Sequence, residues 1–89
     1  MKVKALYTDY WSVRNIDGTV NEGAGTIEHH KNQIYEVVSK TEIGNGTDGY
    51  TIKIGSQYGA IRVKDCEIVE GSEDDLNNNL INNNLTLVL

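Results

Sequence analysis

The chain has 89 residues, and eight basic against thirteen acidic residues give a formal net charge of -5. A domain of this size has a thin hydrophobic core, which leaves little room for an enclosed active site. An acidic surface repels phosphate backbones and anionic membranes, so the composition disfavours nucleic acid and lipid as partners and favours a protein with a basic surface.

Five short strands are predicted along the chain, separated by turns rich in Gly, Asn and Asp. The first covers residues 2–10, where apolar and polar residues alternate loosely. Residues 11–26 form a long loop, or a bent hairpin with Asp17-Gly18 at a tight turn. The other four strands are short runs rich in β-branched residues, at 33–39, 50–54, 58–63 and 66–69. Strands and Gly-rich turns without a helical period predict a mainly β fold, a small barrel.

A helix or tail is predicted after the last strand. Ser72 can cap a helix whose first turn holds three acids, where the helix dipole favours them. Asparagine is a poor helix former, so the triple-Asn blocks that follow need a surface to pack on. That surface is the open end of the barrel, a partner, or a second copy of the chain; a frayed terminus is the remaining reading. Self-association would use Leu76, Leu80, Ile81 and Leu85. We therefore predict two parts, residues 1–71 and 72–89.

Three segments resemble, in order, the Src-homology-3 (SH3) family. Residues 5–10 (ALYTDY) resemble its ALYDY box with Thr8 inserted. Residues 27–38 (IEHHKNQIYEVV) are similar to its LSFKKGDIIEVL stretch, and residues 59–66 (GAIRVKDC) stand where the family has GYIPSNYV. The resemblance spans residues 3–70. It implies a five-stranded SH3-like barrel with an extended RT loop, which is the family's name for the first long loop.

The resemblance also implies a binding face between the RT loop and the n-Src loop. In the family this groove holds proline-rich peptides on a shelf of aromatic rings, with acids in the RT loop. Tyr7 and Tyr10 match the tyrosines of the ALYDY box. The groove tryptophan, proline and second tyrosine are replaced here by Gly49 or Tyr50, by Arg62 and by Asp65. We therefore expect the fold without the proline-rich ligand.

Trp11 is the only tryptophan and stands at the start of the long loop. In that place a tryptophan is either a core residue or an anchor of an interface. We expect aromatic anchors with an acidic rim that attracts a basic protein, formed by Tyr7, Tyr10, Trp11, Asp17, Glu22, Glu28 and Tyr50. On this hypothesis, Trp11→Ala leaves the fold intact and abolishes partner capture.

Two other functions are consistent with the sequence. A small β-barrel can bind nucleic acid, here through Lys53, Arg62 and Lys64, with stacking on Tyr50 and Tyr58. A structural role would instead assemble copies through the tail. Richness in Asn, Ile, Lys and Leu is typical of AT-rich coding in low-GC Gram-positive bacteria and their phages. This composition favours a phage-borne or plasmid-borne inhibitor or adaptor that binds one host protein.

Catalysis, metal binding and cofactors are not predicted. His29 and His30 are adjacent, so on a strand they face opposite sides, and no zinc-ligand spacing accompanies them. No general base and nucleophile can be assigned to one site. Cys66 is the only cysteine and aligns with a buried position; a lone cysteine indicates a reducing compartment. Residues 1–5 lack the apolar region of a signal peptide and no run is long enough to span a membrane, so we expect a cytoplasmic protein.

Overall fold

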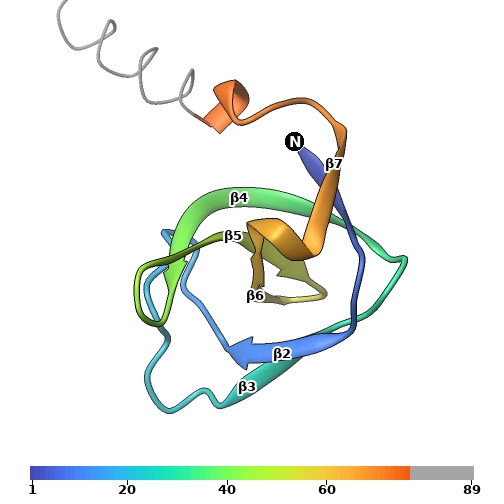
Figure 1. Cartoon of the computed structure of the whole chain (residues 1–89). Helices are drawn as coiled ribbons and strands as arrows, with labels where there is room; N and C mark the ends of the chain where they lie inside the picture. The colour runs from blue at the N-terminus through green and yellow to red at the C-terminus, as the bar shows by residue number, and fades with distance from the viewer. Residues whose placement is uncertain (77–89) are drawn as a thin grey trace, which may run out of the picture.

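The computed structural model describes residues 1–76 (Figure 1), and within them the chain is almost entirely β. The strands and the single 3₁₀ turn of this part are β1 (Lys2–Ala5), β2 (Asp9–Ser12), β3 (Thr26–His29), β4 (Ile34–Ile43), β5 (Thr47–Ile54), β6 (Gln57–Arg62), η1 (Val63–Asp65) and β7 (Cys66–Glu70). The prediction of a mainly β fold is confirmed.

Five strands form one antiparallel sheet in the order β6-β5-β4-β1-β7, and β2 and β3 form a separate two-stranded sheet. The five predicted strands correspond to the members of the larger sheet. The predicted closed barrel is not seen, because β6 and β7 are the two edges of this sheet. The turn η1 leads the chain from β6 to β7, which then pairs with β1.

The region predicted as one strand over residues 2–10 is divided between the two sheets. β1 ends at Ala5, and the Leu6 N–H donates to the Asp65 carbonyl at 2.8 Å, next to the Ala5↔Cys66 pair. β2 starts at Asp9 and pairs with β3. The predicted long loop therefore lies within a hairpin, and residues 13–25 connect its two strands.

The hairpin of β4 and β5 is longer than the sequence suggested. Pairing runs from Val37↔Ile52 to Ile43↔Thr47, with a shift of register between Val37 and Ser39, and only residues 44–46 form the turn. Asn45 and Gly46 have φ angles of 44° and 77°, and the Thr47 N–H donates to the Gly44 carbonyl at 2.9 Å. These positive φ angles are typical of the two-residue turns that join twisted strands, which explains why pairing begins at once on either side.

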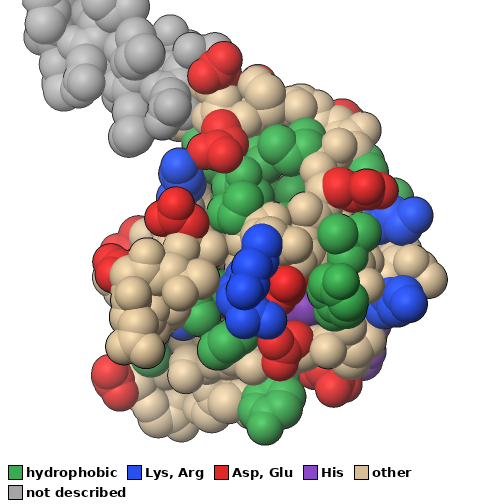
Figure 2. Space-filling view, viewed as in Figure 1, with side chains coloured by type: hydrophobic (Ala, Val, Ile, Leu, Met, Phe, Trp, Pro, Cys, Tyr) green, Lys and Arg blue, Asp and Glu red, His purple; other side chains and the backbone are tan. Residues whose placement is uncertain are grey.

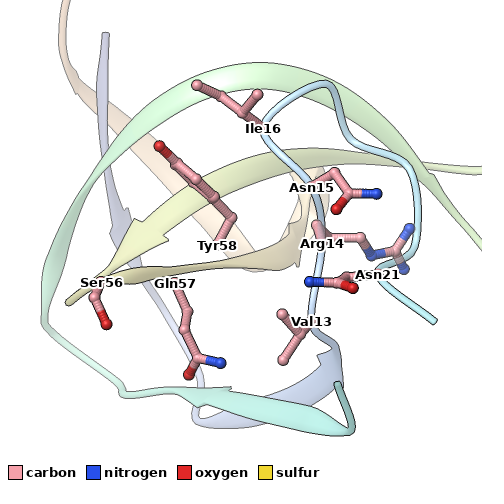
Figure 3. Close-up of a pocket in the computed structure, with 8 residues that line it drawn as sticks. All are labelled: Val13, Arg14, Asn15, Ile16, Asn21, Ser56, Gln57 and Tyr58. Carbon is pink, nitrogen blue, oxygen red and sulfur yellow. The ribbon is translucent and has the colours of Figure 1, made fainter. Parts of the chain in front are cut away.

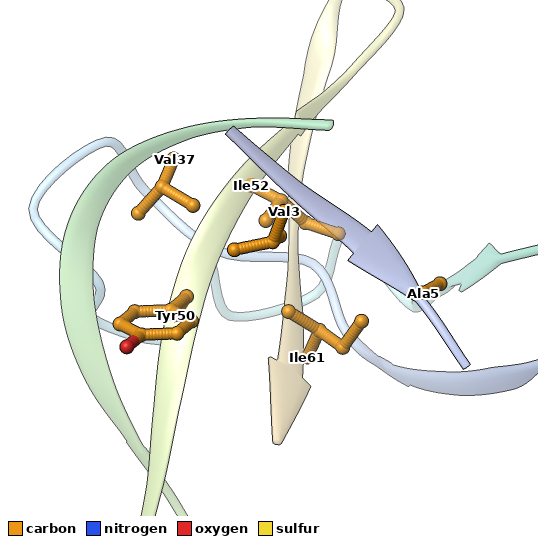
Figure 4. Packing of buried hydrophobic residues seen from close by; sticks show 6 residues of the cluster. All are labelled: Val3, Ala5, Val37, Tyr50, Ile52 and Ile61. Atoms are coloured by element: carbon orange, nitrogen blue, oxygen red, sulfur yellow. The ribbon is translucent and has the colours of Figure 1, made fainter. Parts of the chain in front are cut away.

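The hydrophobic core is formed by side chains from strands of the larger sheet. It contains Val3, Ala5, Val37, Tyr50, Ile52 and Ile61 (Figure 4). Alternation along β5 buries Tyr50 and Ile52 on the predicted apolar face. Gly59 lets β3 approach β6 closely, since a Cβ there would lie 2.9 Å from Ile27 and 2.7 Å from Ile54. The small hairpin therefore packs on the edge strand of the larger sheet.

The predicted C-terminal helix is described only at its start. Residues 74–76 form a helical turn, and the Ser72 N–H donates to Asp75 Oδ2 at 3.1 Å. Leu76 is half-buried against the core cluster. Leu80, Ile81 and Leu85, predicted to mediate self-association, lie outside the described residues.

Candidate partner-binding face

The long loop between β2 and β3 is attached to the larger sheet by Arg14, whose side chain is almost fully buried. Its Nη1 donates to the Gly18 carbonyl, to Thr41 Oγ1 and to the Glu42 carbonyl at 3.4, 3.1 and 3.2 Å. Its backbone N–H donates to the Tyr58 carbonyl at 2.9 Å. No carboxylate contacts this guanidinium in the described residues, and burial lowers its pKa. The guanidinium group of Arg14 thus uses its hydrogen-bond donors to hold the loop in place.

Two tyrosines in this region are exposed, Tyr10 on the outer face of the β2–β3 hairpin and Tyr7 just before β2. Tyr10 lies directly opposite Glu28, so both side chains project from the same side of the hairpin. Tyr10 is 62% exposed, and Tyr7, just before β2, is 58% exposed. Glu28 Oε2 lies 3.7 Å from Nδ1 of His30. The fold leaves both rings accessible, and Glu28 lies beside Tyr10.

Trp11 lies on the opposite, inner side of the same hairpin. It pairs across from Ile27, whose side chain points at β6. The Arg62 guanidinium lies 5.4 Å from the centroid of the Trp11 ring, within range of a cation–π contact. Trp11 Nε1 is buried and has no hydrogen-bond partner among the described residues. The structure thus places Trp11, which is partly buried, on the β6 side of the hairpin, opposite to Tyr10.

Arg62, whose guanidinium lies over the Trp11 ring, also forms ion pairs with two acidic residues. Its Nε donates to Asp65 Oδ2 at 2.6 Å, and its Nη2 lies 3.7 Å from Asp9 Oδ2. Asp65 is 4% exposed, whereas the Arg62 side chain is 31% exposed, so the pair is buried on its acidic side alone. Figure 2 looks onto this face and shows basic side chains in the middle of the view directly beside acidic ones. The charge of Arg62 is therefore neutralised within the protein.

The predicted acidic rim does not converge on one place. Asp17 lies at the turn of the long loop, where its Oδ1 accepts bonds from the N–H and hydroxyl of Thr19 at 3.0 and 2.6 Å. These bonds lower the pKa of Asp17. Its carboxylate borders a pocket between the loop and β4. Glu22 is exposed near the other end of the loop and borders a different pocket beside Ser12 and Thr26. Only Glu28 adjoins Tyr10.

Tyr50 was predicted for this face and belongs instead to the core. Tyr50 is 1% exposed, because its side chain points to the same inner side of β5 as that of Ile52. Its hydroxyl donates to Glu73 Oε2 at 2.7 Å. The ring is thus unavailable to a partner.

The residues proposed to bind nucleic acid are also dispersed. Lys53 pairs across from Tyr58 at one end of the β5–β6 hairpin, whereas Arg62 pairs across from Gly49 at the other end. The four-residue separation along β6 corresponds to about 13 Å. Arg62 is already paired with two carboxylates, and Tyr50 cannot stack on a base because it is buried. The placement gives no continuous basic strip.

One of the two histidines, His29, and the cysteine, Cys66, are withdrawn from solvent to different degrees. His29 is fully buried, and neither ring nitrogen has a partner among the described residues. Burial lowers its pKa, although Asp9 and Asp65 oppose this. Half-buried Cys66 has a pKa raised to about 11 by burial, so its thiol is protonated at neutral pH. Among residues 1–76, no three His, Cys, Asp or Glu side chains are grouped to hold a metal ion.

Glu73 is an attachment point that the sequence did not reveal. It accepts hydrogen bonds from the Tyr50 hydroxyl and from Lys40 Nζ, both at 2.7 Å. The spacing of Ser72 and Asp75 resembles that of a capping box, which is a local signal that can be read from the sequence. The contact between Glu73 and a residue 23 positions earlier has no local signal in the sequence.

Comparisons with known proteins add no relative: neither a family model, nor a curated protein, nor a solved structure matches this chain. In the part of the chain that the structure covers, no helix has the length and apolar character needed to cross a membrane.

Proposed function

We propose that this chain is a non-enzymatic protein-interaction module that binds its partner through the outer face of the β2–β3 hairpin. We call this surface, formed by Tyr7, Tyr10 and Glu28, the tyrosine face. The observation that carries the proposal is the exposure of the two rings, 58% for Tyr7 and 62% for Tyr10. Tyrosine offers a large contact area with few rotatable bonds and a hydroxyl for hydrogen bonding, and it is enriched in protein interfaces.

The scaffold supports this function because it holds the hairpin rigidly. Arg14 fixes the connecting loop to β4 and β6 through three hydrogen bonds, and a fourth bond joins it to Gly18 within the loop. The strands under the tyrosine face pack on the edge of the larger sheet through Ile27 and Gly59. A preorganised surface loses less conformational entropy when it binds.

The arrangement of elements supports an SH3-like class for this module. A long loop follows the first strand, in the place of the extended RT loop; in addition, a 3₁₀ turn precedes the last strand, and β1 lies between β4 and β7. The ligand we propose differs from that of the family. Arg62 and Asp65 form an ion pair where the family has a proline and a tyrosine, so an apolar shelf for proline rings is interrupted by charge.

We infer a partner with a basic surface around an apolar centre. Glu28 lies directly beside Tyr10, and the chain carries a net charge of -5. Complementary charge at the rim accelerates encounter and selects against acidic partners, while the buried aromatic contacts supply affinity. A phage-borne or plasmid-borne inhibitor or adaptor of a host protein is the biological setting that the composition favours.

The proposal is tested by selection from a phage-displayed random peptide library, followed by calorimetric titration of the selected peptides. We expect peptides rich in Lys and Arg around an apolar residue. Tyr10→Ala should weaken their binding by about 2 kcal/mol, as for an interface hot spot. Ile34→Ala is the control, because Ile34 is 56% exposed on β4, outside the tyrosine face. Unchanged binding by Tyr10→Ala, or peptides without basic residues, would refute the proposal.

A further inference from the structure

The two ends of the β2–β3 hairpin are attached to the larger sheet by different contacts. The end that carries the long loop, which we call the loop end, is held through Arg14, whose backbone N–H donates to the Tyr58 carbonyl of β6 at 2.9 Å (Figure 3). Ser39 Oγ of β4 also donates to the Ile16 carbonyl of the loop at 2.9 Å. Backbone amides, carbonyls and hydroxyls do not titrate near neutral pH, so these bonds persist in mild acid.

The opposite end of the hairpin begins with the pair of Asp9 and His29, and we call it the His29 end. These two side chains lie on the same side of the hairpin as those of the next pair but one, Trp11 and Ile27. That side faces β6, because the Arg62 guanidinium lies over the Trp11 ring. His29 is fully buried there, so it stands in the contact between the hairpin and the larger sheet.

The charged groups around His29 are already paired with one another. Within the described residues, three titratable groups act on it: Asp9 of β2, Asp65 of η1 and the neighbouring His30. Arg62 Nε donates to Asp65 Oδ2 at 2.6 Å, and Arg62 Nη2 lies 3.7 Å from Asp9 Oδ2. Neither ring nitrogen of His29 has a hydrogen-bond partner among these residues. The cation that balances the two carboxylates is therefore Arg62.

A proton on His29 would place a second cation in this packing. Burial disfavours the charged imidazole more than the two carboxylates and the Tyr7 carbonyl favour it, so the pKa of His29 is lowered. In a form of the protein whose His29 end has left the sheet, which we call the open form, the ring is hydrated and its pKa is about 6.5. Below that pH the proton therefore favours the open form over the closed one.

From this arrangement we infer that His29 makes the hairpin's attachment acid-sensitive: when His29 gains a proton, residues 7–11 and 27–31 leave the larger sheet, while Arg14 still holds the loop end. The hairpin is a sheet of its own, so its opening breaks no strand pairing in the five-stranded sheet. The consequence for binding rests on the proposed function. The tyrosine face lies entirely within the His29 end, so acid would remove the preorganised form of this face.

The test is hydrogen exchange of the ¹⁵N-labelled full chain, followed by NMR at pH 7.5 and 5.5, in buffer and in urea below the unfolding transition. Protection is the exchange rate of an unstructured chain divided by that of the protein at the same pH. We expect the protection of β2 and β3 to fall about tenfold between the two pH values, since the open form gains a proton near pH 6.5. This protection should hardly depend on urea, because the opening exposes little surface, whereas that of β4 and β5 should fall steeply.

His29→Phe and His29→Leu, which keep an apolar side chain in this place, should both lose the pH effect on β2 and β3. His30→Gln is the matched control and should keep it, because His30 lies at the surface beside Glu28. The inference is overturned if the wild type shows no such fall, if the fall persists in a His29 variant, or if His30→Gln abolishes it.

It is also overturned if β2 and β3 follow the urea dependence of β4 and β5, since the hairpin would then open only when the whole chain unfolds. The wild type alone decides this point, whatever the variants do. No partner takes part in the exchange experiment, so its failure leaves the proposed function standing. Conversely, unchanged peptide binding by Tyr10→Ala would refute the function and leave the acid-sensitive opening intact.

Discussion

The hydroxyl of Tyr50 donates a 2.7 Å hydrogen bond to Glu73 Oε2 and thereby connects the centre of β5 to the segment that follows the last strand. Burial is the main cause that raises the pKa of Tyr50, so this hydroxyl remains a donor at all physiological pH values. Hydrogen bonds from Lys40 and Tyr50 lower the pKa of Glu73. One carboxylate thus attaches residues 72–76 to the body of the protein.

Removing the charge of this carboxylate should loosen the attachment. In Glu73→Gln we expect a loss of about 1–2 kcal/mol in the free energy of unfolding, since a part-buried hydrogen bond to a charged group is weakened. Urea denaturation measures the change. Glu70→Gln is the control, because Glu70 is 67% exposed and its pair with Lys2 at 3.7 Å should contribute little. Equal effects in both variants would contradict a specific role for Glu73.

Gly18 should be required for docking of the long loop. Its φ of 94° is unfavourable for other residues, and a Cβ there would lie 2.5 Å from the Lys40 carbonyl oxygen. We expect Gly18→Ala to cost about 2–4 kcal/mol from backbone strain and overpacking together. Gly23→Ala has a similar φ of 80° but meets nothing within 4 Å, so it should cost about 1 kcal/mol.

Urea denaturation of both glycine variants separates strain from contact. A loss in Gly18→Ala no larger than in Gly23→Ala would mean that the loop does not need its close approach to β4. The ¹⁵N NMR spectrum of Gly18→Ala should show its largest changes in residues 13–20 and 40–42.

His29 should make the protein less stable in mild acid. Burial lowers the pKa of His29 below its ordinary value of about 6.5, so below that pH the unfolded chain binds a proton that the folded chain does not. Stability is therefore complete above pH 6.5 and falls as the pH is lowered. His29→Phe should remove this dependence, whereas His30→Gln, at an exposed position, should keep it.

The measurement is the urea midpoint of each variant at pH 7.5 and 5.5, a range in which the carboxylates stay ionised. The same decrease in wild type and His29→Phe would show that another group causes the acid sensitivity.

Cys66 should react slowly in the native protein. Its pKa is raised from 9.0 to about 11 by burial, so at neutral pH the reactive thiolate is about a hundredfold rarer than in the unfolded chain. Labelling with a disulfide reagent at pH 7.5 should be slower by that factor in buffer than in urea. Equal rates in the two conditions would mean that the thiol is exposed.

Much of the secondary structure was predictable because its signals are local. The glycines after Ile54 and Ile43 marked the turns of both long hairpins. The burial of Tyr50 was not predicted, because both faces of β5 are covered from Gly49 to Ile52. The division of residues 2–10 between two sheets was not predictable, since it depends on β1 pairing with β4 and β7 while β2 pairs with β3. No pattern in the sequence indicated that Arg62 would form ion pairs with Asp65 and Asp9.

The amino-acid sequence by itself determined the β character, the places of the turns and the acidic charge of the surface, because these follow from neighbouring residues and from composition. The tertiary structure decided which aromatic side chains face outward. Tyr10 and Trp11 are adjacent, yet pairing with β3 and packing on β6 put one ring in water and the other beneath Arg62. A side chain's exposure depends on what distant strands place over it, and no local pattern in the chain records that.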